Sequence, residues 1–163
     1  VLGITGAVLD RVGGNACTAQ TTLVVAEDNP RQPQIAGPVL ATSRLDAPPD
    51  SAGLRPFRVG PAIVIPRLDA IIRNDQPVVI ALSVAAAADQ DGPIELSWTV
   101  TRTIDGGAPE LFAQGGPIAD GRGARAWEFA AGKLPLGHYT IQLRAKSLDN
   151  VEIVRDISFD RVP

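Results

Sequence analysis

The chain contains few of the residue types that usually perform catalysis. Its 163 residues include one histidine, one cysteine, no methionine, two tryptophans, one tyrosine and four phenylalanines. Cys17 and His138 lie far apart in the sequence, so a Cys–His dyad is not favoured, and no G-x-S-x-G nucleophile motif accompanies His138. A hydrolase with paired carboxylates stays open as a minor alternative, since Asp and Glu are plentiful. We therefore expect that the protein is not an enzyme.

Long apolar runs and runs of like charge are also missing. The longest apolar stretch, "VVIALSVAAAA" (78–88), suits a buried strand and is too short to cross a membrane. The net charge is −3, with both signs interspersed. Nothing forms the basic stripe that a phosphate backbone requires. We expect neither a nucleic-acid partner nor a transmembrane segment.

No motif predicts a metal or a cofactor. A Cys/His cluster of the kind that binds zinc is absent from the sequence. "DQDGPIE" resembles part of a calcium loop through Asp89, Asp91 and Glu95. In a complete loop the glycine stands sixth and a glutamate twelfth, whereas here Gly92 stands fourth and Val100 twelfth. An ordinary Asp-Gly turn is the better interpretation.

What is present favours strands broken by turns. Hydrophobic residues make up 45% of the chain, many of them β-branched, and they are accompanied by 16 glycines and 14 prolines. The single cysteine allows no internal disulfide. Because the chain begins at Val1 and has no methionine, we expect a processed product or a piece of a longer polypeptide, and a removed export signal would fit.

Composition divides the chain into three zones. Residues 1–28 hold two apolar-rich runs around Gly13-Gly14-Asn15, which predicts a β-hairpin. Residues 29–60 carry six prolines and predict an extended connector with a short strand at "GPVLATSRL" (37–45). Residues 61–163 have about the length of one immunoglobulin-like sandwich.

Alternation within the third zone predicts half-buried antiparallel strands. "IELSWTV" places Trp98 on an apolar face, and "HYTIQLRAK" places Tyr139 on another. Turn sequences separate the alternating runs at 73–77, 89–93, 105–109, 120–123, 134–137 and 147–150. The spacing predicts about seven short strands, and the fold class is an all-β, immunoglobulin-like antiparallel sandwich.

Two aromatic residues are predicted to be structural. The sequence Pro-x-Gly-x-Tyr before the strand that contains Tyr139 is typical of the tyrosine corner, in which the hydroxyl bonds to nearby backbone. Trp98, in mid-strand and facing inward, is the expected core tryptophan. His138 falls on the opposite strand face and is expected to be solvated.

The segment "RAWEF" provides the candidate interaction residues. Arg125, Trp127 and Phe129 share one strand face. If that face were exposed, Arg125 and Trp127 could anchor a protein interface, or Trp127 could stack on a sugar. A sandwich also needs aromatic residues in its core, and the core is the favoured location for Trp127 and Phe129.

The order of segments resembles a bacterial family. It is similar to the C-terminal sandwich region of secreted von Willebrand factor A-related proteins and of GWxTD-type proteins. The matching pieces are "VLGITGAVLDRVGGNACTAQTTLVV", "GPVLATSRL", "RPFRVGPAIVIP" and "KLPLGHYTIQLRAKSLDNVEIVRDISF". The von Willebrand domain with its metal-dependent adhesion motif is absent, as is the GWxTD motif itself.

The resemblance implies an extracytoplasmic, non-catalytic module and carries over no functional residues. It also raises the possibility that residues 1–28 are the last two strands of a preceding sandwich. From these inferences we expect a structural or interaction module of a larger cell-envelope assembly, in the periplasm or on the cell surface. Its partners would be other proteins, bound through sandwich loops, edge strands or the proline-rich arm. A carbohydrate-binding module is the alternative.

Overall fold

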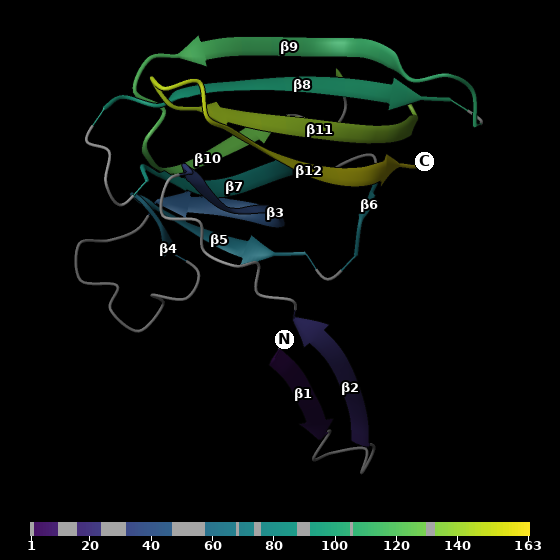
Figure 1. The fold of residues 1–163 in the computed structure, drawn as a ribbon. Coiled ribbons are helices and arrows are strands. Elements are labelled where there is room, and N and C mark those ends of the chain that lie inside the picture. The colour runs from purple at the N-terminus through teal and green to yellow at the C-terminus, as the bar shows by residue number, and fades with distance from the viewer. Residues whose placement is uncertain are drawn as a thin grey trace.

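Alternating segments of the sequence become strands of two sheets that pack face to face (Figure 1). The computed structural model describes residues 2–9, 16–23, 32–46, 58–67, 69–73, 76–87, 92–104, 106–129 and 133–163, and for the first two ranges and Phe129 the backbone alone. The strands are β1 (Leu2–Leu9), β2 (Ala16–Leu23), β3 (Gln34–Asp46), β4 (Arg58–Val59), β5 (Ala62–Pro66), β6 (Ile71–Ile72), β7 (Val78–Ala85), β8 (Glu95–Thr103), β9 (Glu110–Ile118), β10 (Gly123–Phe129), β11 (Gly137–Lys146) and β12 (Glu152–Arg161). The prediction of an all-β sandwich is confirmed.

Each large sheet has five strands. The order is β10-β7-β3-β5-β4 in one, here called the β7 sheet, and β6-β12-β11-β8-β9 in the other, called the β11 sheet. Pairing is antiparallel except between β12 and β6. The six predicted turn sequences all fall at junctions between consecutive strands. Asp89 and Asp91, from the proposed Asp-Gly turn, lie outside the described residues.

The β11 sheet follows the alternation that the sequence predicts. β11 pairs with β12 and with β8 along nearly its whole length. One face of β11 is buried, through Tyr139, Ile141, Leu143 and Ala145. The residues between them are more exposed and mostly polar. A face that alternates in this way fixes the register, because a slip of one residue would expose every buried side chain.

The β7 sheet is buried on both faces at its centre. Every residue of β7 from Val78 to Leu82 is buried. One set faces the β11 sheet and joins the main core. The other set, Val79 and Ala81, forms a second apolar cluster with Ala41 and Val64 on the outer face of the sheet. A continuous apolar run is what double burial requires.

Strand β3 lies in the range 29–60, which the sequence analysis assigned to a connector. The expected short strand at 37–45 is present, but it is longer and sits between β7 and β5 in the sheet. Pro38 fits there because the pairing of β3 with β7 shifts register between Ala36 and Val39. A proline cannot donate a ladder hydrogen bond, so it is tolerated where the ladder is interrupted.

The N-terminal hairpin is also present. β1 and β2 pair antiparallel from Leu2↔Leu23 to Leu9↔Ala16 and form a two-stranded sheet of their own. The predicted turn at Gly13, Gly14 and Asn15 lies outside the described residues.

Candidate functional site

An open cleft lies at the end of the sandwich where β8 and β12 end and β11 begins (on the right in Figure 1). It has a volume of about 900 Å³. Its walls come from β6, the end of β8 with the start of the β8–β9 connection, the residues that lead into β11 with its first residues, and the end of β12. These segments are far apart in the sequence, so only the fold brings them together.

Three large aliphatic side chains surround this cleft and are partly exposed. Ile71 is 37% exposed, Ile104 45% and Leu136 47%. Single exposed aliphatic residues are ordinary, but several around one concavity form an apolar surface that a partner can cover. The described part of the chain also exposes Leu148, at the opposite end of the sandwich, to 68%.

A row of polar side chains borders the cleft on the β11 sheet. Thr103, His138 and Asp160 occupy neighbouring positions on β8, β11 and β12. The imidazole Nδ1 of His138 lies 2.7 Å from the carboxylate Oδ1 of Asp160, and both side chains are about half exposed. Within the described residues, no side-chain hydrogen bond joins Thr103 to His138. His138 is solvated, as the alternation predicts.

Two arginines hold the walls of the cleft. Arg102 donates to the carbonyl oxygen of Leu136 through Nε at 3.1 Å and Nη2 at 2.6 Å, and its Nη1 lies 3.4 Å from the carboxylate of Glu110. Arg161 is 5% exposed and donates from Nη1 to the carbonyl oxygen of Val162. These charge-assisted hydrogen bonds to backbone carbonyl groups restrict the motion of the segments that line the cleft, including the one that carries Leu136.

Tyr139 lies directly behind the cleft and makes the predicted corner. It is fully buried, and its hydroxyl donates to the carbonyl oxygen of Pro135 at 2.7 Å. Its ring stacks on Phe159, with centroids 5.2 Å apart, and meets the ring of Phe112 edge-on at 5.5 Å. Burial raises the pKa of the Tyr139 phenol above its ordinary value of 10.0.

The other predicted residues lie on the inner side of the sandwich. Trp98 and Trp127 are partly buried, pack against the main core and face one small apolar cavity of about 90 Å³. Arg125 lies in β10 opposite Leu82, and its Nη2 reaches back to the β9–β10 turn, where it donates to the carbonyl oxygen of Asp120 at 3.1 Å. In the same turn Arg122 donates to the carboxylate of Asp120, which lowers the pKa of that carboxyl. Arg125 and Trp127 occupy alternate positions of β10, and both are partly buried.

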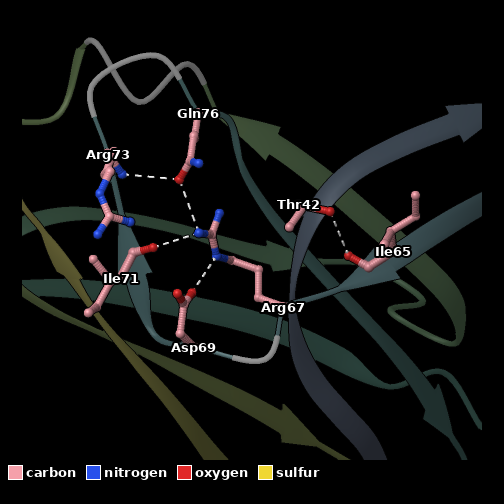
Figure 2. A network of polar contacts seen from close by, with 7 residues as sticks. All are labelled: Thr42, Ile65, Arg67, Asp69, Ile71, Arg73 and Gln76. Atoms are coloured by element: carbon pink, nitrogen blue, oxygen red, sulfur yellow. Dashed lines mark hydrogen bonds and ion pairs between the residues drawn. The ribbon is translucent and has the colours of Figure 1, made fainter. Parts of the chain in front are cut away.

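A polar network at the crossover between the sheets was not predicted (Figure 2). Arg67 follows β5, and only 5% of its side chain is exposed. It donates to Asp69 at 3.1 Å, to the carbonyl oxygen of Ile71 at 2.7 Å and to the side-chain oxygen of Gln76 at 3.0 Å. The backbone N–H of Arg73 donates to the same oxygen of Gln76 at 3.2 Å. The network fixes the chain where it passes from the β7 sheet to β6 in the β11 sheet.

The sequence held a weak signal for the cleft and none for the network. Leu136 lies inside the turn sequence "LPLG", and Ile104 directly precedes "DGGAP". A large aliphatic residue in a turn cannot be assigned to a core by alternation, so such residues are candidates for a surface contact. Arg67 looks like any polar residue at the end of a strand, because its partners are set by the tertiary fold.

Comparison with protein-family models finds no match, and neither does comparison with curated proteins. Within the described ranges, no group of three or more His, Cys, Asp or Glu side chains is placed to hold a metal ion. Nor does the described part of the chain contain a helix with the length and apolar character needed to cross a membrane.

Proposed function

We propose that the chain is a non-catalytic interaction module, a subunit or domain of a larger cell-envelope assembly outside the cytoplasm. The module presents the cleft at the end of the sandwich to a partner protein. One observation supports this proposal above the others. Ile71, Ile104 and Leu136 are partly exposed around a single open cleft whose walls are held by buried and half-buried arginines.

The composition of the cleft favours a modest, mixed interface. The aliphatic side chains around it would lose water on binding, at roughly 25 cal/mol for each Å² of apolar surface. His138, Asp160 and Thr103 form a polar border. Such a mixture of apolar and polar side chains is usual for the surface of a protein–protein contact.

The test compares the two ends of the sandwich. Ile104→Asp places a charge in the cleft, and Leu148→Asp places the same charge on an exposed aliphatic position at the opposite end. We expect proteins that co-purify specifically with the wild-type chain from the native cell envelope to be lost with Ile104→Asp and kept with Leu148→Asp. Retention of every partner by both variants would refute the cleft as the binding surface.

The carbohydrate alternative depends on Trp127. Its indole is partly buried and faces an apolar cavity, which leaves less of the ring for stacking on a sugar. Glycan-array binding by the wild-type chain that disappears with Trp127→Ala, while the fold survives, would favour this alternative over a protein partner.

A further inference from the structure

Among the described strands, the two large sheets have four edge strands, β10, β4, β6 and β9. Three of these have features that hinder pairing with another strand. β4 and β6 have two residues each. β9 is longer, but its pairing with β8 shifts register twice, and it contains Pro117. Short strands, bulges and prolines are the devices by which proteins prevent pairing at a sheet edge.

β10 carries none of these devices. It pairs with β7 in an unbroken register from Gly123↔Val84 to Phe129↔Val78 and contains no proline. On its other side no described strand is hydrogen-bonded to it. A long, regular strand with one side unpaired is a template for another strand.

The core is incompletely covered beside this edge. Trp127 of β10 faces residues of β8 and β11 across the cavity of about 90 Å³. The edge strand β10 therefore lies opposite β8 and β11, and β9, the next strand after β8, extends beyond the edge of the β7 sheet. Within the described part of the chain, no strand of the β7 sheet stands opposite β9. In Figure 1, β9 is the top strand and β8 is drawn next to it.

The inner side of β9 is only partly covered, by the indole of Trp98 over Gly115 and by the core residues next to Ala113. Ala113 and Gly115, which pair with Val100 and Trp98, are only partly buried. Phe112 packs its ring against buried Tyr139 and is still 38% exposed. A second apolar cavity of about 70 Å³ lies among these residues. One more strand beside β10 would cover this region.

The chain itself contains a strand pair of suitable length. β1 and β2 have eight residues each, against seven in β10, and among the described strands they pair only with each other. A two-stranded sheet is marginal in water unless it packs on something. The sequence of β1, "LGITGAVL", has Leu2, Ile4 and Val8 at alternate positions, and alternate positions of a strand share a face.

The connection to β3 is long enough for donation to another molecule. Residues 24–33 lie between the hairpin and β3. Fully extended, ten residues span about 33 Å, which exceeds the spacing of several strands.

We propose that β1 of one copy pairs with the free edge of β10 in a second copy, and lays its apolar residues over the inner side of β9. The interface is strand addition, with main-chain hydrogen bonds for affinity and alternate side chains for specificity. It uses a surface separate from the cleft, so either proposal can fail without the other.

The test uses the full chain and two defective variants. Ile4→Lys alters the donor strand and leaves the acceptor edge intact. Ala113→Lys places a charge on the inner side of β9 and leaves the donor strand intact. If circular dichroism shows that Ala113→Lys is unfolded, Phe112→Ser is used as the acceptor variant instead. Leu148→Lys, in the turn between β11 and β12, is the control at an exposed position outside β1, β9 and β10.

We expect the wild-type chain and Leu148→Lys to sediment as species of two or more chains, and each defective variant to sediment as one chain. An equimolar mixture of the two variants should recover a two-chain species, since one supplies the donor and the other the acceptor. A monomeric wild-type chain at all accessible concentrations would overturn the proposal. So would a mixture that stays monomeric, or association that Ile4→Lys leaves unchanged.

Discussion

The two sheets of the sandwich bury their residues in different ways. In the β11 sheet, the central strand β11 alternates between buried and more exposed residues, and its outer face is polar. In the β7 sheet, the central strand β7 is buried on both faces, and Val79 and Ala81 belong to a second cluster outside the main core. The β11 sheet therefore contributes side chains to one apolar cluster, and the β7 sheet contributes to two, one on each of its faces.

The difference shows which sequence signals are informative. Alternation in β11 predicts both the strand and the face that it buries. A continuous apolar run such as that of β7 predicts a buried strand, but not what covers each face. Substitutions on the two sheets test whether this difference in burial also appears in the free energy of unfolding.

The largest effect is expected from the shared core on the β11 side. Leu143 is 1% exposed and faces the β7 sheet. Leu143→Ala should lower the free energy of unfolding by about 2–5 kcal/mol, through lost burial and the cavity left behind. The neighbouring outer-face change Gln142→Ala should cost no more than about 0.5 kcal/mol. Urea denaturation of both variants measures the contrast, and equal costs would contradict the assignment of one buried face to β11.

The next pair compares the two faces of β7 directly. Val78 and Val79 are neighbours of one residue type, 1% and 0% exposed, and they face opposite sides of the sheet. Val78→Ala and Val79→Ala should each cost about 2–3 kcal/mol, because each removes two buried methyl groups and leaves a cavity. A shift of the urea midpoint confined to Val78→Ala would show that the outer cluster contributes no core of its own.

A smaller effect is expected where the two sheets are joined. Arg67→Met removes the side-chain donor to the carbonyl oxygen of Ile71 and one of two donors to the side-chain oxygen of Gln76, which keeps the backbone N–H of Arg73. We expect a loss of about 2 kcal/mol in the free energy of unfolding, as for other partly buried hydrogen bonds to a charged group. Arg67→Lys keeps the charge but not the planar fork, so it should recover only part of the loss. Full recovery by lysine would mean that charge alone holds the crossover.

The smallest effect concerns the corner of the β11 sheet. Tyr139→Phe removes the hydrogen bond to Pro135 and should cost about 1 kcal/mol at neutral pH. The raised pKa of Tyr139 also predicts a pH dependence. Above pH 10.0 the unfolded chain loses its phenolic proton before the folded chain does. The free energy of unfolding should therefore fall as the pH rises from there through the folded-state pKa.

The variant provides the matched control for that pH dependence. In Tyr139→Phe the tyrosine contribution to the alkaline decline should be absent, and the two stability curves should converge at high pH. Because Tyr139 is the chain's only tyrosine, absorbance at 295 nm reports its titration directly. An ordinary titration near pH 10 in the folded protein would contradict the raised pKa.

Much of the fold was predictable from particular residues. Tyr139 with its preceding Pro-x-Gly, the alternation around Trp98 and the six turn sequences predict a sandwich, and its strands lie where those signals place them. The assignment of β3 to a connector failed to anticipate its central position. Prolines usually exclude a central strand, and the interruption of pairing at Pro38 that makes an exception possible is a property of the neighbouring strand β7.

The candidate site was less predictable. Ile71, Ile104 and Leu136 come from segments separated by more than thirty residues, and they share a cleft only because β6, the end of β8 and the start of β11 lie on one side of the sandwich. No periodic pattern in the sequence predicts that these three residues lie around one cleft. Arg67 poses the same problem, since its contacts join two sheets.

The position of β7 has a consequence for dynamics. β10 and β3 pair with it on either side, and apolar clusters cover both of its faces. We expect the amide hydrogens of its buried residues Val78–Leu82 to exchange through opening of the whole sandwich, and those of the two-residue strands β4 and β6 through local fluctuations. Amide exchange in the peptide Val78–Ala85 therefore measures global unfolding, even when the sandwich is part of a larger protein or assembly.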